Sequence, residues 1–129
     1  MRENSIKKFK EKLRNDSSVM GPFSKTSDPA FIEAMGYAGC DFVILDLEHG
    51  PNSVQTLQNL IRAAEISGVL PIVRVKENNP SVIGEVLDIG AGGVQVPQIT
   101  NARQAKETIQ LAKFAPMGMR GVCRFVRAA

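Results

Sequence analysis

Short, nearly continuous apolar runs separated by helix-start signals limit what this chain can fold into. The runs are DFVILDL (41–47), LPIVRV (70–75) and GVQV (93–96), and a less regular run at 19–24 precedes them. Strands covered on both faces have this composition, whereas strands with one face in water alternate apolar and polar residues. A helix-forming segment follows each run. The order strand, helix, strand, helix predicts parallel βαβ units in an α/β fold.

Capping residues mark where each expected helix begins and ends. The starts are Ser27-Asp28-Pro29, then Asn52 or Ser53, then Asn79-Pro80, then Asn101. The ends are Gly39, Gly68, Gly90, and finally Pro116 with Gly118. Apolar residues at three-four spacing predict inward faces. These are Phe31, Ile32 and Met35; Val54, Leu57, Ile61 and Ala64; Val82, Ile83, Val86 and Leu87; and Ala102, Ala105, Ile109 and Ala112.

The four expected βα units are half of the eight that make up a (β/α)8 barrel. Four parallel strands could belong to a doubly wound sheet or to part of a (β/α)8 barrel, and a complete barrel needs about 250 residues. The chain has 129 residues, with no linker or second domain. We therefore expect residues 1–129 to supply the first four βα units of one TIM-barrel domain. Unpaired sheet edges at both sides imply a fragment, or a barrel completed by something else.

The charge and composition of the chain limit the classes of partner that it could bind. The formal net charge is +3, and much of the basic excess lies in an expected N-terminal helix at about 3–14, where Lys7, Lys8, Lys10, Lys12 and Arg14 alternate with Ile6, Phe9 and Leu13. One Tyr and no Trp argue against a nucleic-acid surface. No apolar run approaches the roughly 20 residues of a membrane span. The two cysteines, Cys40 and Cys123, form no motif, so a cytoplasmic protein is expected.

Polar side chains gather where the second and third strands end, and reactive groups of parallel α/β proteins lie at this end. Asp46 and Glu48 are two residues apart, so a strand directs both to the same side, and His49 follows. Crowded carboxylates need a shared cation or proton. The cluster predicts an acid–base or metal-adjacent site. In the alternative interpretation, Asp46 binds loop amides, Glu48 is solvated and His49 only precedes a helix.

Other candidate residues leave alternatives open. Arg74 could hold a substrate carboxylate or a developing oxyanion, or could only form a salt bridge with Asp46 or Glu48. Asp88, at the end of a helix, could cap, pair or do nothing. Lys25 and Lys76 follow strands, where an imine-forming lysine could stand. The stretch GAGG at 90–93 precedes a strand and lacks phosphate-loop spacing, so it predicts a helix-to-strand turn.

Four segments are together recognisable: DFVILDLEHGPN, PIVRV, LDIGAGGVQVPQITNARQA and APMGMRGV. With them the chain resembles the HpcH/HpaI aldolase family, the class II pyruvate aldolases that act on 4-hydroxy-2-oxo acids. The resemblance runs from the first strand to the C-terminus and covers only the first half of a family member. The related citrate-lyase branch usually has an acidic residue where His49 stands, which favours the aldolase branch.

The resemblance implies roles for particular residues. His49 would be the catalytic base, Asp88 the partner that raises its basicity, and Arg74 the residue that stabilises the pyruvate enolate. Asp46 and Glu48 would lie near the metal without binding it directly, and Arg120 would be structural or line the mouth. The family holds its divalent ion, Mg²⁺, Mn²⁺ or Co²⁺, with a Glu and an Asp on later strands. Those ligands are expected beyond Ala129, with none in this chain.

The expected function follows from that resemblance. It is the reversible cleavage of a 4-hydroxy-2-oxo acid to pyruvate and an aldehyde by a metal-dependent homo-oligomer with a small 2-oxo acid as substrate. The 129 residues alone are expected to be inactive because the metal ligands are missing. The alternative is a non-catalytic half-barrel, or a degenerate aldolase, that acts as an assembly module.

Overall fold

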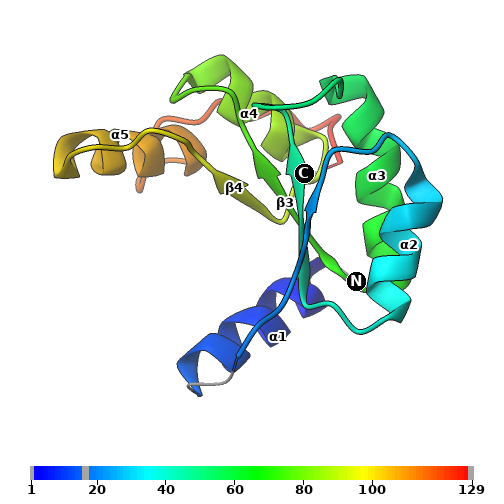
Figure 1. The fold of residues 1–129 in the computed structure, drawn as a ribbon. Helices are drawn as coiled ribbons and strands as arrows, with labels where there is room; N and C mark the ends of the chain where they lie inside the picture. Colours follow the sequence, from blue (N-terminus) through cyan, green and yellow to red (C-terminus); the bar gives the residue numbers. More distant parts are fainter. Residues whose placement is uncertain (1, 16–17, 128–129) are drawn as a thin grey trace.

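The computed structural model describes residues 2–15 and 18–127, and its strands form one parallel sheet in the order β1-β2-β3-β4. Figure 1 shows α2 and α3 side by side on one face of this sheet and α1 below it. The elements are α1 Arg2–Arg14, β1 Phe23–Ser24, α2 Pro29–Tyr37, β2 Phe42–Asp46, α3 Val54–Ser67, β3 Leu70–Arg74, α4 Pro80–Asp88, β4 Gly93–Gln95 and α5 Ala102–Ala112. Every expected strand and helix is therefore present.

The two faces of the sheet differ in burial. Side chains directed toward the helices, such as Val43, Leu45 and Val73, are fully buried in one core with residues of α3 and α4. On the opposite face, Phe23 is 49% exposed. A doubly wound sheet carries helices on both faces, whereas a barrel carries them only outside. The arrangement is that of four βα units of a (β/α)8 barrel, as expected.

The helix starts agree with the capping residues. The side chains of Asp28, Asn79 and Asn101 accept hydrogen bonds from backbone N–H groups in the first turns of α2, α4 and α5. Of the two candidates for α3, the cap is Ser53, which accepts from the N–H of Thr56. Asn52 is instead buried, and its amide donates to the carbonyl oxygens of residues 25 and 26. It thus ties the loop after β1 to the start of α3.

The first strand is shorter than predicted. Sequence periodicity indicated residues 19–24, but only Phe23 and Ser24 pair with β2. The preceding segment still lies along β2, since the carbonyls of Met20 and Pro22 accept from the N–H groups of residues 41 and 44. Pro22 has no N–H to donate, so regular strand pairing starts only after it.

Of the fifteen residues expected to face inward, six are buried, five are half-buried and four are exposed, and at those four the prediction was wrong. Ile32 is fully buried, while its neighbour Phe31 is 40% exposed, because adjacent helical residues point about 100° apart. In α5, Ala102, Ala105 and Ile109 are all exposed, and the helix has no buried residue. Burial needs a neighbouring element, and among the described elements α5 contacts mainly α4.

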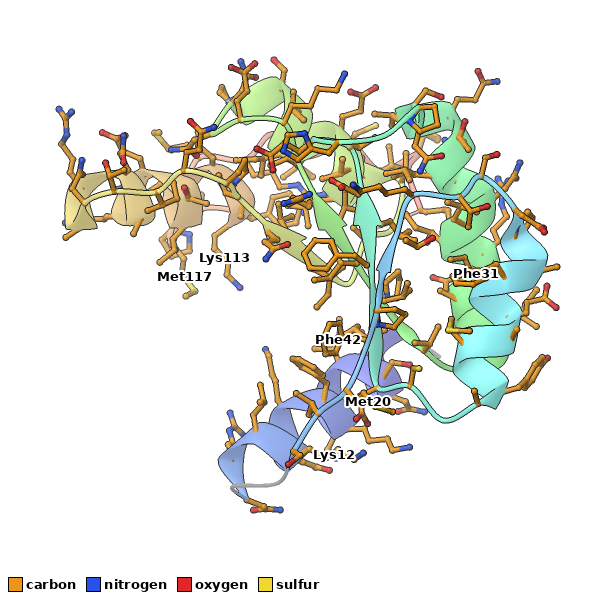
Figure 2. The ribbon with its side chains drawn as sticks, viewed as in Figure 1. Lys12, Met20, Phe31, Phe42, Lys113 and Met117 are labelled. Atoms are coloured by element: carbon orange, nitrogen blue, oxygen red, sulfur yellow. The ribbon has the colours of Figure 1, made fainter. Side chains whose placement is uncertain are left out.

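Helix α1 covers the end of the sheet at which the strands begin. The ring of Phe9 packs edge-on against that of Phe42, with 5.7 Å between centroids, and Lys12 forms an ion pair with Asp41. In Figure 2 the labelled Phe42 and Lys12 lie where α1 meets the sheet. Ile6 is half-buried and Leu13 half-exposed, so only part of the expected apolar stripe is used. The basic side chains mostly face solvent. In the part of the chain that the structure describes, no helix is long and apolar enough to cross a membrane.

The glycine-rich stretch after α4 is a turn, as predicted. Gly90 adopts a positive φ of 104°, which side chains disfavour. Gly92 packs so closely on Leu70 that an added Cβ would lie 2.5 Å from its Cδ1. These two glycines let the chain turn tightly from α4 into β4.

Candidate active site

Two carboxylates hold Arg74 where β2 and β3 end. Its Nε donates to Asp46 Oδ1 at 2.9 Å and its Nη2 to Oδ2 at 2.7 Å, while Nη1 lies 3.1 Å from Glu48 Oε2. Asp46 and Arg74 are direct partners in the parallel register. Both acids bind the same guanidinium, although Glu48 lies in the bend after β2 and not in the strand that the sequence indicated.

Asp46 is fully buried yet remains ionised. The bonds from Arg74 lower its pKa most, and the backbone N–H groups of His49 and Glu48 lower it further, against the opposing effect of burial. The same bonds to Asp46 raise the pKa of Arg74. The sequence left open that Asp46 only binds loop amides and that Arg74 only forms a salt bridge. Both of these contacts are present. Glu48 is not freely solvated, because its side chain is only 14% exposed.

The guanidinium of Arg74 is oriented but still accessible. Its central carbon lies 4.9 Å from the ring centroid of Phe23, and its side chain is 20% exposed. A guanidinium has five N–H groups, and single contacts of Nε, Nη1 and Nη2 with carboxylates engage three. At least two N–H groups therefore remain for a further acceptor.

His49 lies beside this cluster. Its Nε2 is 3.8 Å from Oε1 of Glu48, so Glu48 stands between His49 and Arg74. The imidazole is 66% exposed. The imidazole and the guanidinium consequently lie at the same end of the sheet, which the proposed chemistry requires.

Asp88 lies at the other end. It is the last residue of α4, and a helix between parallel strands returns to the end where the next strand starts. Its carboxylate accepts a bond of 2.6 Å from Nη2 of Arg120, whose guanidinium stacks at 4.5 Å on Phe114. The expected pair of Asp88 and His49 is thus not made within the chain. Arg120 has a structural contact here, beside a cavity of about 550 Å³ and away from His49.

Sequence reasoning missed two residues of the mouth, Phe23 and Gln95. Gln95 pairs in register with Arg74, and residues paired on adjacent strands share a face. The sequence alone predicts that Gln95 lies in the fourth strand. It does not predict the strand register that brings Gln95 beside Arg74. Lys25 and Lys76, the imine candidates, are both exposed.

The side chains that the structure describes do not make a metal site. Among the described side chains, no group of three or more His, Cys, Asp and Glu could hold an ion. Both oxygens of Asp46 bind Arg74, and Glu48 is shared with the same guanidinium. Residues 2–15 and 18–127 therefore offer no complete ligand set of their own.

In (β/α)8-barrel enzymes the active site lies at the carboxyl ends of the strands, which is the end of this sheet where the charged side chains gather. Residues 19–128 match the family model described as HpcH/HpaI aldolase/citrate lyase, so the chain belongs to this family.

Similar proteins agree with this placement. The chain is 36% identical over 117 residues to a 2-dehydro-3,6-dideoxy-6-sulfogluconate aldolase of Pseudomonas putida, covering 91% of this chain and 46% of that protein. A family protein of Burkholderia cenocepacia J2315 superposes with a TM-score of 0.87 at 30% identity, covering 94% and 50%. The citrate synthase SbnG superposes with a TM-score of 0.82 at 39% identity, covering 88% and 46%. The chain spans about half the length of these relatives.

Proposed function

We propose that this chain carries the proton-transfer and enolate-binding half of an aldolase active site, which reversibly cleaves a 4-hydroxy-2-oxo acid to pyruvate and an aldehyde. The observation that supports it most is the placement of His49 and Arg74 on either side of Glu48. The match to the family and to a named aldolase supports the same chemistry. The substrate is a small 2-oxo acid and not a nucleic acid.

His49 removes the proton of the substrate hydroxyl in the cleavage direction. An exposed imidazole is accessible to substrate, and histidine is the side chain best suited to accept a proton near neutral pH. A positioned base of this kind contributes about 10²- to 10⁴-fold to a rate. In the synthetic direction the same group returns the proton to the new hydroxyl.

Arg74 binds the oxygen that becomes negative when the carbon–carbon bond breaks. Its bonds to Asp46 and its stacking on Phe23 hold the guanidinium before substrate arrives. A preorganised cation stabilises developing charge without reorganising in the reaction. The remaining N–H groups of Arg74 supply the bonds.

We further propose a requirement for Mg²⁺, Mn²⁺ or Co²⁺, held by Glu and Asp side chains outside these 129 residues. When bound, such an ion draws electrons from the carbonyl of a 2-oxo acid. Asp46 and Glu48 both bind Arg74, so they would orient this residue beside the ion rather than hold the ion themselves. Removal of the metal by a chelator should abolish pyruvate release from the complete protein, and each of the three ions should be tested for recovery.

Asp88 is proposed to act on His49 of another subunit in a homo-oligomer. Within one chain it lies at the opposite end of the sheet, and its side chain is 32% exposed. A partner chain is therefore the way for the expected pair to form. Mixed oligomers of His49→Ala and Asp88→Asn subunits test this, because some sites then contain both native residues. Recovered activity in the mixture supports the proposal, and no recovery in verified mixed oligomers contradicts it.

The test of the function uses the complete protein in the cytoplasmic, reducing conditions proposed for it. Pyruvate release from a panel of 4-hydroxy-2-oxo acids is measured, and condensation is measured as well because one relative is a citrate synthase. Chelator-sensitive release is the expected result. Borohydride trapping of pyruvate on Lys25 or Lys76 would instead show an imine mechanism. A protein with no activity in either direction would favour the assembly-module alternative.

A further inference from the structure

The imidazole of His49 depends on its own loop for its position. The side chain is 66% exposed, and its Nε2 lies 3.8 Å from Glu48, so side-chain packing holds it only weakly. A catalytic base must stand within hydrogen-bond reach of the proton that it removes. The backbone that carries His49 between β2 and α3 therefore sets where the imidazole can go.

Both ends of this short stretch of backbone are held by hydrogen bonds. At its start, the N–H of His49 donates to Asp46 Oδ1 at 3.3 Å. At its end, Asn52 is only 6% exposed, and its Nδ2 donates to the carbonyl oxygens of residues 25 and 26 at 3.3 and 3.4 Å. Between them, the ring of Pro51 fixes its own φ. Residues 49–52 consequently have little freedom while both anchors are in place.

The loop after β1 also touches the same stretch directly. A Cβ added at Gly50 would lie 3.6 Å from Cβ of Lys25 and 3.8 Å from the carbonyl oxygen of Asp46, which are ordinary contact distances. Gly50 therefore rests between the chain that leaves β1 and the end of β2. Asn52 bonds to the segment on which Gly50 rests, so its amide keeps the backbone after His49 pressed against the β1 loop.

We propose that Asn52 is a positioning residue for proton transfer, which holds the imidazole of His49 in reach of the substrate by binding the loop after β1. The inference rests on the proposed function. Asn52 is buried and acts through His49, not on the substrate itself. Carbonyl oxygens only accept hydrogen bonds, so the link needs the N–H donors of the amide, which a leucine of similar size lacks.

Asn52→Leu in the complete protein tests the proposal, and Ser53→Ala is the matched control. Ser53 is the adjacent residue and caps α3 by accepting from the N–H of Thr56, so its loss weakens the same helix start without breaking the link to the β1 loop. In Asn52→Leu kcat should fall about 10- to 10²-fold, since a shift of about 1 Å in a reacting group can cost that much. Ser53→Ala should keep kcat within about 2-fold. The inhibition constant of pyruvate should change less than about 2-fold in both variants, because His49 is not needed to bind it.

The His49→Ala background separates positioning from a general structural role. If Asn52 acts through His49, adding Asn52→Leu to His49→Ala should lower kcat no further, because the two losses are not additive. An equal fold-loss in both backgrounds would overturn the proposal, and so would an Asn52→Leu single variant with kcat within about 2-fold of wild type.

The NMR signal of the imidazole gives a measurement that does not depend on catalysis. His49 is the one histidine of the 129 residues, and His49→Ala identifies its ¹H–¹³C signal in protein labelled at histidine. The signal should shift or broaden in Asn52→Leu and stay in place in Ser53→Ala. If Asn52→Leu does not fold, Asn52→Ser, which is smaller and polar, is measured with the same expectations. A wild-type protein without aldolase activity would contradict the proposed function, and an unchanged signal would then overturn the positioning role by itself.

Discussion

Arg74 and Arg120 are each held by one aspartate and one phenylalanine ring, and Arg74 is held by Glu48 as well. Arg74 binds Asp46 and stacks at 4.9 Å on Phe23, and Arg120 binds an aspartate of α4 and stacks at 4.5 Å on a ring after α5. Burial is reversed between them. At the strand ends the carboxylate is fully buried and the arginine 20% exposed, whereas at α4 the arginine is 9% and the carboxylate 32% exposed.

The difference shows that the same three side chains serve different purposes according to which charge is buried. With Asp46 buried, the cation of Arg74 stays partly exposed and is held in place by a buried carboxylate. With Arg120 buried, the carboxylate of Asp88 is presented instead. Only the first cluster has a histidine beside it, so only the first combines a cation with a proton acceptor.

The largest effect is expected at the histidine that distinguishes the clusters. His49→Ala should lower kcat of the complete protein about 10²- to 10⁴-fold, because the base is lost. Thermal unfolding should hardly change, since the side chain is 66% exposed. Pyruvate release and a melting curve are the measurements. A variant that keeps full kcat would remove the central role assigned to this residue.

The two arginines should respond differently to the same substitution. Arg74→Lys should lower kcat/KM about 10²- to 10³-fold, because a lysine cannot bind Asp46 and a substrate oxygen in the same geometry. Arg120→Lys should lower the free energy of unfolding by about 2 kcal/mol through its bond to Asp88. Steady-state kinetics and urea unfolding of both variants separate the effects. If Arg74→Lys lowers the free energy of unfolding and leaves kcat/KM unchanged, the two arginines do not differ in the way proposed.

The stabilisation from the Asp46–Arg74 pair should decrease as the pH falls. Because the bonds from Arg74 lower the pKa of Asp46 in the folded protein, this carboxylate contributes its full stabilisation above about pH 4, the ordinary value for an unfolded aspartate. The contribution is lost as the pH falls through the lowered pKa. Urea midpoints of wild type and Asp46→Asn should therefore converge below about pH 4. A difference that stays constant down to pH 3, about one unit lower, would argue against this account.

The smallest effects are expected from the stacked rings. Phe23→Leu should lower kcat/KM about 3-fold, since a cation–π contact at an exposed site contributes about 0.5–1 kcal/mol. The matched variant Phe114→Leu should lower stability by a similar amount and leave kcat/KM unchanged. Phe23→Tyr, which keeps the ring, should restore the rate. If Phe23→Leu and Phe114→Leu alter kcat/KM equally, the two clusters are not functionally distinct.

Local signals were enough to predict much of the fold. The caps Asp28, Asn79 and Asn101 act within one helical turn, so neighbouring residues alone decide them. The sequence also indicated that Asp46 and Glu48 lie together, and both bind Arg74, although β2 ends at Asp46. The position of Asp88 could also be predicted. A residue that ends a helix between parallel strands lies at the end of the sheet where the strands begin, away from the carboxyl ends. The resemblance implied a pair of Asp88 with His49, which this geometry does not allow within one chain.

Contacts between distant segments could not be predicted in the same way. The exposure of Ile109 depends on which element covers α5, and the three-four pattern shows only that a face is apolar. The stacking of Phe23 on Arg74 joins two strands that are not neighbours in the sheet. The place of Gln95 depends on a register that no single strand specifies.

The amino-acid sequence by itself determined the four βα units, their caps, and a cluster of ionisable groups at the carboxyl ends of β2 and β3. Those features arise from interactions over one to four residues. Only the tertiary structure decided that Arg74 binds both acids, that Gln95 stands on its other side, and that Asp88 lies away from His49. The physical reason is that strand register and helix packing are set by burial between segments far apart in the chain.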